Sequence, residues 1–385
     1  MRDSRSLLKL CWSLLPLVLA AALPAHAADS ILAAPVFYGA STCGSTACHG
    51  GATAKSCQLT VWSQRDVHSR SYATLTNARS ARMAEALQIP NAAQSSRCTI
   101  CHAPLADVPA LITSDASSPP ATRATESVSC VSCHGPAGDW LRTHPRLDYT
   151  HAERVAAGLK DLHSAYVRAG TCVACHQNID PELVARARHP ELIFELDGQS
   201  ASQPKHWQEL PGWSGAQNWY VGQLVALREV SWALAQKTAD TERETPRQHA
   251  LAWLTARAAG ATASVSTEDF SAAVAAADAL AKTASNETWT PARALETLRR
   301  LAATATDFRD AKVSQPEQAR RAEALVLAFD RLIVAQPVAA RTTLNPANAE
   351  LEKLFTLAQS RPDFTPAKFA EGLEALVAAL PPAGS

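Results

Sequence analysis

The chain has 385 residues, which is enough for two domains and leaves room for a third. Its 36 basic and 36 acidic residues balance each other, so the charge gives no sign of a nucleic-acid-binding surface. Ten cysteines and nine tryptophans are the unusual features of the composition. The composition therefore argues against a nucleic-acid-binding protein and leaves the cysteines to be explained.

The first 27 residues have the pattern of a secretory signal peptide. Arg2, Arg5 and Lys9 form a basic start, Leu14–Leu23 is a short apolar run, and Ala25–Ala27 is a small-residue cleavage site. An uncleaved anchor is the alternative, but the apolar run is short for a bilayer span. We therefore expect a periplasmic protein without a transmembrane anchor once the signal is cleaved.

Eight of the ten cysteines form four pairs, and a histidine directly follows each pair. Such a motif attaches haem c, because the two thiols bond to the vinyl groups on one porphyrin edge and the histidine ligates the iron. The sequence thus predicts four covalently bound haems c. The predicted attachment residues are Cys43 and Cys48, Cys98 and Cys101, Cys130 and Cys133, and Cys172 and Cys175, and the predicted proximal ligands are His49, His102, His134 and His176.

Cysteine pairs in an exported chain can also form disulfides or bind zinc. Neither use requires a histidine directly after every pair, whereas haem attachment does. The first motif has four intervening residues instead of two, and Gly44 and Ser45 suit an outward loop there. Cys57 then has no partner in the mature chain. We expect a buried, inert thiol, with a reactive or intermolecular cysteine as the alternative.

Each haem iron has a second axial position, and Met83 is the only methionine after the signal peptide. Histidine is therefore the expected distal ligand, and His68, His144 and His189 are the main candidates. His68 shares one face of a predicted helix with Val61 and Tyr72. His144 precedes a proline, and His189 precedes a proline at the end of a helix that Asp180-Pro181 begins, so both lie at helix ends.

Three candidates for four irons leave one iron five-coordinate unless another histidine binds it. His151, at the start of a predicted helix, and His163, beside its apolar face, are the residues that could do so. His206 and His249 lie beyond the last motif and are expected to be structural or exposed.

The motif order resembles the tetrahaem cytochrome c-554 family, which includes electron carriers of nitrogen-oxidising pathways and, more broadly, multihaem enzymes. The similar segments are Trp62–His68, Cys133–Pro136 and His189–Leu192, within roughly residues 36–200. The resemblance implies the four proximal ligands above and distal roles for His68, His144 and His189, without assigning their pairing. Because the type member leaves its second haem five-coordinate, the open iron here would be the one bound through His102. The longer first spacer and a long helical C-terminal region depart from the family pattern.

The expected fold is mainly α. A multihaem cytochrome c domain of short helices and loops around four haems spans residues 28–204, an α-helical bundle spans 205–380, and 381–385 is a tail. Within the first domain, 113–125 has the composition of an exposed loop. Thr290-Pro291, Asn345-Pro346 and Thr365-Pro366 predict helix starts, and Ser314 with Glu317 fits a capping box. We expect six or seven helices in the bundle, with Trp219, Trp232 and Trp253 inside it or facing the haems.

These features favour an electron-transfer protein whose closely spaced, mostly bis-histidine haems exchange electrons with donor and acceptor proteins. The helical domain would dock partners or support a homo-oligomer or complex. The alternative is a multihaem oxidoreductase that acts on a small nitrogen or sulfur compound at one five-coordinate haem. A haem-based sensor or a subunit of a membrane redox complex is the third hypothesis. No triad, phosphate loop or paired-carboxylate motif is present, so no catalytic residue is predicted.

Overall fold

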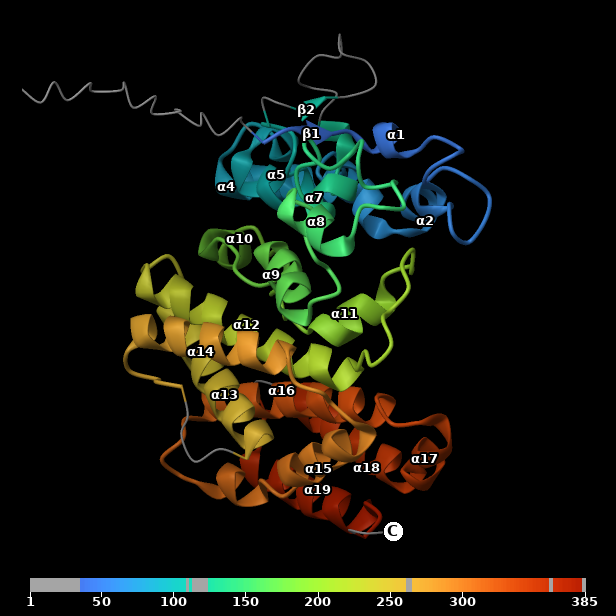
Figure 1. Cartoon of the computed structure of the whole chain (residues 1–385). Helices are drawn as coiled ribbons and strands as arrows, with labels where there is room; N and C mark the ends of the chain where they lie inside the picture. The colour runs from blue at the N-terminus through green and yellow to red at the C-terminus, as the bar shows by residue number, and fades with distance from the viewer. Residues whose placement is uncertain (1–34, 109–110, 113–123, 261–264, 360–362, 383–385) are drawn as a thin grey trace, which may run out of the picture. The chain divides into compact units, whose positions relative to one another are not determined.

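The computed structural model describes residues 35–108, 111–112, 124–260, 265–359 and 363–382 (Figure 1). The predicted signal peptide and most of the predicted 113–125 loop lie outside these ranges. Residues 35–385 belong to one compact unit, and the predicted boundary at 204 stays a prediction. As expected, the described fold is mainly helical. No helix in the described ranges is long and apolar enough to span a membrane.

The N-terminal half consists of short elements. In chain order they are β1 (Phe37–Tyr38), α1 (Ala40–Cys43), α2 (Gln58–Arg65), the 3-10 helix η1 (Val67–Arg70), α3 (Ser71–Thr74), α4 (Ala78–Leu87), η2 (Ala92–Gln94), α5 (Ser96–His102), β2 (Leu111–Ile112), η3 (Ala124–Glu126), α7 (Cys130–His134), α8 (His151–Ala156), α9 (Ala165–His176), α10 (Pro181–Ala185) and α11 (Leu196–Ser202). β1 and β2 pair in parallel, with Phe37 opposite Leu111.

The C-terminal half consists of longer helices. They are α12 (Gly215–Ala235), α13 (Thr241–Ala259), α14 (Phe270–Ser285), α15 (Pro291–Ala302), η4 (Ala305–Arg309), α16 (Gln315–Val334), α17 (Val338–Thr343), α18 (Asn345–Gln359) and α19 (Pro366–Ala379). These are eight α-helices in the described residues, so the expected six or seven was too few, and the short α17 is the kind of element that periodicity misses.

The expected helix starts are largely present. Thr290 and Thr365 precede α15 and α19, each with a proline in the first turn, and the Ser314 side chain accepts a hydrogen bond from the Glu317 amide at the start of α16. Asn345 is instead the first residue of α18.

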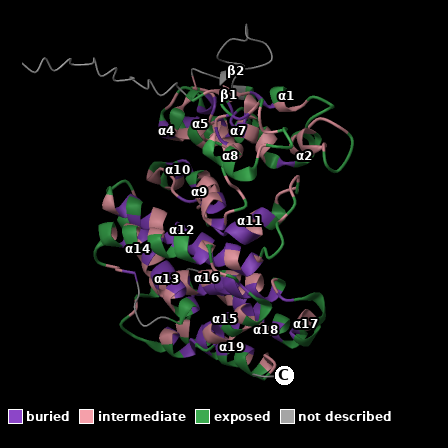
Figure 2. Cartoon of the chain, viewed as in Figure 1, coloured by how far each residue is buried: buried purple, intermediate pink, exposed green. Residues whose placement is uncertain are grey.

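Most of the 21 residues of α12 are buried, because α9, α11, α13, α14 and α16 all contact it. The buried residues gather in α12, α16 and the helices around them (Figure 2). The buried face of α14 consists of Ala273, Ala277, Ala281 and Ala284, and these small side chains allow close packing on α12. Trp219 is fully buried here, whereas Trp232, also on α12, is 47% exposed.

The two halves bury their apolar residues differently. One large cluster fills the bundle and extends into the N-terminal half through Ala169 and Val173 of α9 and through Phe194 and Leu196. Among its described residues, the rest of the N-terminal half has only small clusters, of three or four buried residues each. Short helices with so little apolar core of their own are consistent with a domain that is built around prosthetic groups.

Candidate haem sites

Three of the four motifs lie at the ends of helices. α5 ends at His102, α7 at His134 and α9 at His176. Residues three apart lie on the same face of an α-helix, so the two cysteines of each motif point to one side and the histidine lies next to them. This is the geometry that attachment to one porphyrin edge requires.

The first motif reaches a related geometry through a turn. α1 ends at Cys43, and Ser45, Thr46 and Ala47 are exposed. The His49 amide donates a hydrogen bond to the Cys43 carbonyl over 3.2 Å, which closes the loop. The longer spacer is thus accommodated by looping outward, as the sequence suggested.

Cysteines of different motifs contact each other. A hydrogen bond between Cys43 and Cys130 lowers the pKa of Cys43 and raises that of Cys130. A second bond, between Cys101 and Cys175, lowers the pKa of Cys175 to about 7. The nine cysteines in the described part of the chain form no disulfide. A thiol that has become a thioether no longer titrates, so these contacts report positions: the first motif lies beside the third, and the second beside the fourth.

The third and fourth motifs are also neighbours. Burial raises the pKa of Cys172 to about 12, and the charge of Cys133 adds to that rise. Burial likewise raises the pKa of Cys133 to about 11, with a further contribution from Cys175. The attachment sites therefore follow the spatial order first, third, fourth, second.

Two motif histidines face a distal histidine directly. The ring centroids of His49 and His144 lie 6.1 Å apart with planes inclined by 15°, and those of His68 and His176 lie 6.0 Å apart at 82°. A ligand nitrogen lies about 2 Å from its metal and the ring centroid roughly 1 Å further, so two imidazoles on one metal have centroids roughly 6 Å apart. Both pairs thus have the spacing that a shared iron requires.

The other two motif histidines also have histidine neighbours. Burial lowers the pKa of His134 to about 4, and the next contribution comes from His206, ahead of His49 and His144. Burial lowers the pKa of His102 as well, and His189 adds to that shift. The histidines therefore fall into two sets. We call His49, His144, His134 and His206 the first imidazole group, and His102, His189, His68 and His176 the second.

Six of these eight imidazoles are fixed through Nδ1, which leaves Nε2 free. The Nδ1 partners are Gln58 Oε1 for His49 (3.2 Å), Asp66 Oδ1 for His68 (2.8 Å), Ser71 O for His102 (3.2 Å), Leu141 O for His144 (2.8 Å), Pro190 O for His189 (2.8 Å) and Pro204 O for His206 (3.5 Å). An oxygen acceptor at Nδ1 orients the ring and selects the tautomer in which Nε2 can bind a metal.

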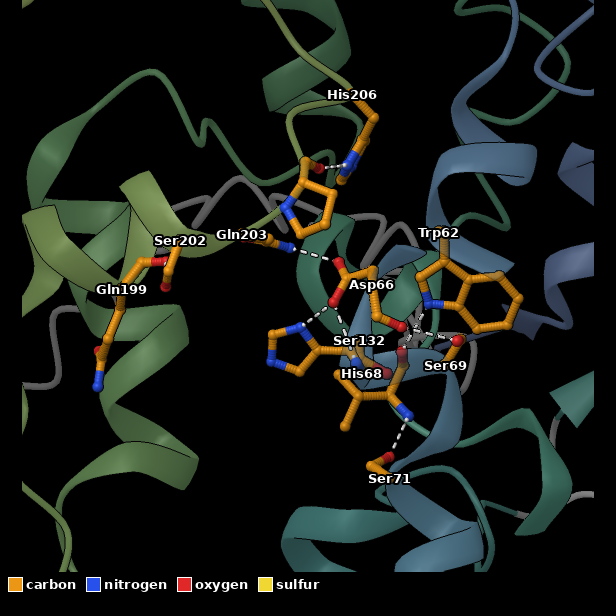
Figure 3. Close-up of polar contacts among 12 residues, drawn as sticks. Trp62, Asp66, His68, Ser69, Ser71, Ser132, Gln199, Ser202, Gln203 and His206 are labelled. Atoms are coloured by element: carbon orange, nitrogen blue, oxygen red, sulfur yellow. Dashed lines mark hydrogen bonds and ion pairs between the residues drawn. The ribbon is translucent and has the colours of Figure 1, made fainter. Parts of the chain in front are cut away.

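Asp66 connects the two imidazole groups (Figure 3). Its side chain is 1% exposed; Oδ1 faces His68, and Oδ2 accepts a hydrogen bond from Gln203 Nε2 over 2.9 Å. Burial alone would raise the pKa of Asp66, but the bonds from His68 and Gln203 outweigh it and lower the pKa to about 2. Asp66 is therefore an anion that orients His68 and fixes the segment that carries His206.

A buried hydrogen-bond donor near the first imidazole group is also consistent with a bound haem. Trp140 Nε1 is buried without a hydrogen-bond partner among the described residues, and the indole lies edge-on to His144 at 5.4 Å. A donor of this kind can pair with a haem carboxylate. No cluster of three or more His, Cys, Asp or Glu side chains in the described ranges could hold a bare metal ion.

The structure corrects some local expectations. α2 ends at Arg65 because Asp66 is extended, so His68 lies in the 3-10 turn η1, whose first residues the Asp66 carboxylate caps. α10 ends at Ala185, four residues before His189. α8 begins at His151 as expected but ends at Ala156, so the long helix that was expected to carry His163 does not form.

The remaining histidines contact other residues in the described part of the chain. His151 uses Nε2 to contact Asp161 Oδ1 over 3.1 Å, and its ring lies 5.7 Å from that of His163. His249 contacts Glu317 inside the bundle, in keeping with a structural role. His206 is the residue that sequence reasoning set aside. The sequence signal for it is a proline-containing stretch without a helix, which follows α11.

Comparison with known proteins supports the resemblance for part of the chain. Residues 42–135 match the family model described as cytochrome c554 and c-prime, and this range contains the first three motifs. No significant match was found among curated proteins or among solved structures. The family match identifies this region as a c554-like, c-type cytochrome, with covalently bound haem c and a role in electron transfer.

Proposed function

We propose that the chain is an exported, periplasmic tetrahaem cytochrome that transfers electrons between redox partner proteins. The observation that carries this proposal is the sorting of eight histidines into two imidazole groups, each beside two of the four attachment motifs. One motif histidine and one distal histidine per iron is the arrangement of a carrier, because two imidazoles fill both axial positions and keep substrates off the iron.

Each histidine and cysteine of these sites would have a defined role in holding a haem. His144 faces His49, His68 faces His176, and His206 neighbours His134, while the cysteine pairs of all four motifs provide the thioethers. Bound haem supplies one-electron chemistry that no side chain here provides. The protein contributes position, ligand orientation through Nδ1 and partial shielding from water of half-buried rings such as that of His134.

The contacts between motifs support an electron carrier in particular. Electron exchange requires redox centres at short separations, and the cysteines of the first and third motifs, and of the second and fourth, are in hydrogen-bond contact. The nearness of Cys133 to Cys172 connects the two pairs. Four centres held in this order would extend from the first motif to the second, with an end available to each of two partners.

The test is haem stoichiometry on the protein produced with its leader in a bacterium that matures c-type cytochromes. We expect the periplasmic fraction to contain a covalent product with four haems per chain, by intact mass and by pyridine haemochrome absorbance. Replacing Cys43 and Cys48 together by serine should leave three haems, whereas Cys57→Ser should leave four. Fewer than four haems in the unaltered chain, or retention of the product in the cytoplasm, would overturn the proposal.

A further inference from the structure

The second motif is the place where the resemblance and the structure differ. By analogy with the c-554 type member, the iron bound through His102 would be open. In this chain, however, His189 stands in the segment that packs beside α5, the helix that carries this motif. His189 can be a ligand there only if its backbone and its ring are both fixed in position.

The α10 segment is fastened to the helices around the second motif. Arg97 of α5 donates to Asp180 Oδ2 over 2.6 Å and to Glu182 Oε2 over 2.8 Å. Arg186 donates to the Ala86 carbonyl at the end of α4 over 3.0 Å. Apolar contact adds to these bonds, since Leu183 and Ala187 belong to one buried cluster with Leu87 of α4.

The backbone then turns at Arg188, whose φ of 57° is in the left-handed region. The Arg188 carbonyl accepts a hydrogen bond from Arg79 of α4 over 3.4 Å. The His189 amide donates back to the Leu183 carbonyl over 2.8 Å, and His189 Nδ1 donates to Pro190 O. The imidazole is thus held at both its backbone and its ring, and Nε2 stays free of these bonds.

His102 is oriented in the matching way. Its Nδ1 lies 3.2 Å from Ser71 O and 3.1 Å from Thr74 Oγ1, which leaves Nε2 for the iron. The supports of the two imidazoles meet at neighbouring residues of α4. Ser80 Oγ donates to the carbonyl of Thr74, which contacts His102, over 2.6 Å, and Arg79 donates to the carbonyl of Arg188, which precedes His189. His49 and His176 already have His144 and His68 beside them, and the segment that carries His189 is bonded to α5, the helix that ends at His102. His102 therefore remains as the partner for His189.

We propose that His189 Nε2 is the sixth ligand of the iron held by Cys98, Cys101 and His102, so that all four irons have two imidazole ligands. This inference rests on the tetrahaem function proposed above and extends it. It removes the one position at which a small nitrogen or sulfur compound could bind iron. The chain is then a carrier without a substrate site, unlike a multihaem oxidoreductase.

The experiment compares the haem-loaded, unaltered chain with His189→Ala and with His163→Ala. His163 is an exposed histidine outside both imidazole groups, so its loss controls for removing an imidazole. The readouts are the spin state of the ferric protein by electron paramagnetic resonance, binding of carbon monoxide to the ferrous protein by difference absorbance, and haem content on the same samples.

We expect the unaltered chain and His163→Ala to contain only low-spin haem and to bind no carbon monoxide. His189→Ala should keep four haems, show one high-spin haem per chain, bind one equivalent of carbon monoxide and return to low spin on addition of imidazole. An unaltered chain with four haems, one of them high-spin, would overturn the inference and leave the tetrahaem proposal intact. Fewer than four haems would instead count against both.

A second variant keeps the inference testable if His189→Ala does not accumulate. Methionine can also ligate haem iron and raises its reduction potential. His189→Met should therefore stay low-spin and shift one of four potentials upward in a spectroelectrochemical titration. Four unchanged potentials would show that residue 189 is not a ligand.

Discussion

Asp66 is the residue on which the most haem-related contacts converge. Its buried carboxylate accepts from the His68 amide over 3.0 Å, faces the His68 ring and accepts from Gln203. A carboxylate at Nδ1 gives a ligated imidazole more anionic character. Such a ligand stabilises ferric over ferrous iron, so Asp66 is expected to lower the potential of the haem held by His176 and His68.

Asp66→Asn tests this role. The amide keeps the size of the side chain but removes the charge, so one of the four reduction potentials should rise. Hydrogen bonds to charged groups contribute about 1.5–3 kcal/mol, and about 1.4 kcal/mol equals 59 mV for one electron, so the rise should be at most about 60–130 mV. Potentiometry followed by haem absorbance measures it.

Asp161→Asn is the matched control for Asp66→Asn. Asp161 also contacts a histidine ring, but that ring, His151, lies outside both imidazole groups. Its replacement should leave all four potentials in place. Equal shifts in the two variants would mean that the effect of Asp66 is general electrostatics and does not act through His68.

At the scale of elements, local signals were predictable and tertiary ones were not. Cap residues such as Thr290, Thr365 and Asp180 mark helix starts because capping depends on neighbouring residues alone. The end of α2 was missed because Asp66, which ends it, is fixed by Gln203 from far along the chain. The cysteine motifs can likewise be recognised from neighbouring residues alone. The pairing of His49 with His144, in contrast, depends on the tertiary fold.

Asp278 of α14 forms a pH-sensitive contact that joins α9, α12 and α14. Tyr166 of α9, Arg228 of α12 and Lys282 of α14 all bond to Asp278. Burial opposes ionisation of Asp278, but these three bonds outweigh it and lower its pKa to about 2. The usual pKa of about 3.9 applies in the unfolded chain, so the contribution of Asp278 is complete above about pH 4 and is lost as the pH falls to about 2.

We therefore expect Asp278→Asn to be less stable than the unaltered chain at pH 7, by up to about 2.5 kcal/mol. The difference should shrink as the pH is lowered from 5 to 2, because protonation removes the same charge from the unaltered chain. Urea unfolding followed by circular dichroism at several pH values measures both. A stability difference that stays constant over this range would contradict the assigned cause.

At the scale of the whole molecule, the haem-bearing half and the bundle share one apolar core. Ala165, Ala169 and Val173 of α9, the helix of the fourth motif, belong to the same cluster as Trp219 and Leu224 of α12. The mainly helical fold followed from residue patterns. The shared core was not predicted, because in the sequence α9 is recognisable only as the helix of the fourth motif. Its second face, which packs against the bundle, is seen only in the structure.

A polar contact joins α9 to the segment between α11 and α12. Arg168 of α9 forms a two-fold hydrogen bond with Glu209, at 3.1 and 2.9 Å, and both side chains are largely buried. Glu209 also accepts from Trp207, the neighbour of His206, over 2.6 Å. The bundle, α9 and the segment that carries His206 are therefore expected to fold as one cooperative unit.

A shortened chain that ends after Ser214 tests this unity. It retains every motif, His206 and Glu209, and so loses only the bundle; its α9 and Leu196 would then expose the apolar faces that α12 covers. Burying one large apolar side chain contributes about 1.5–3 kcal/mol, so several exposed together should exceed the stability of a small domain. We expect the shortened chain to carry fewer than four haems and to be degraded in the periplasm, measured by haem-to-chain ratio and by urea unfolding. A stable product with four haems and an unchanged unfolding midpoint would mean that the haem domain folds by itself, and that the bundle serves partners instead of the haem sites.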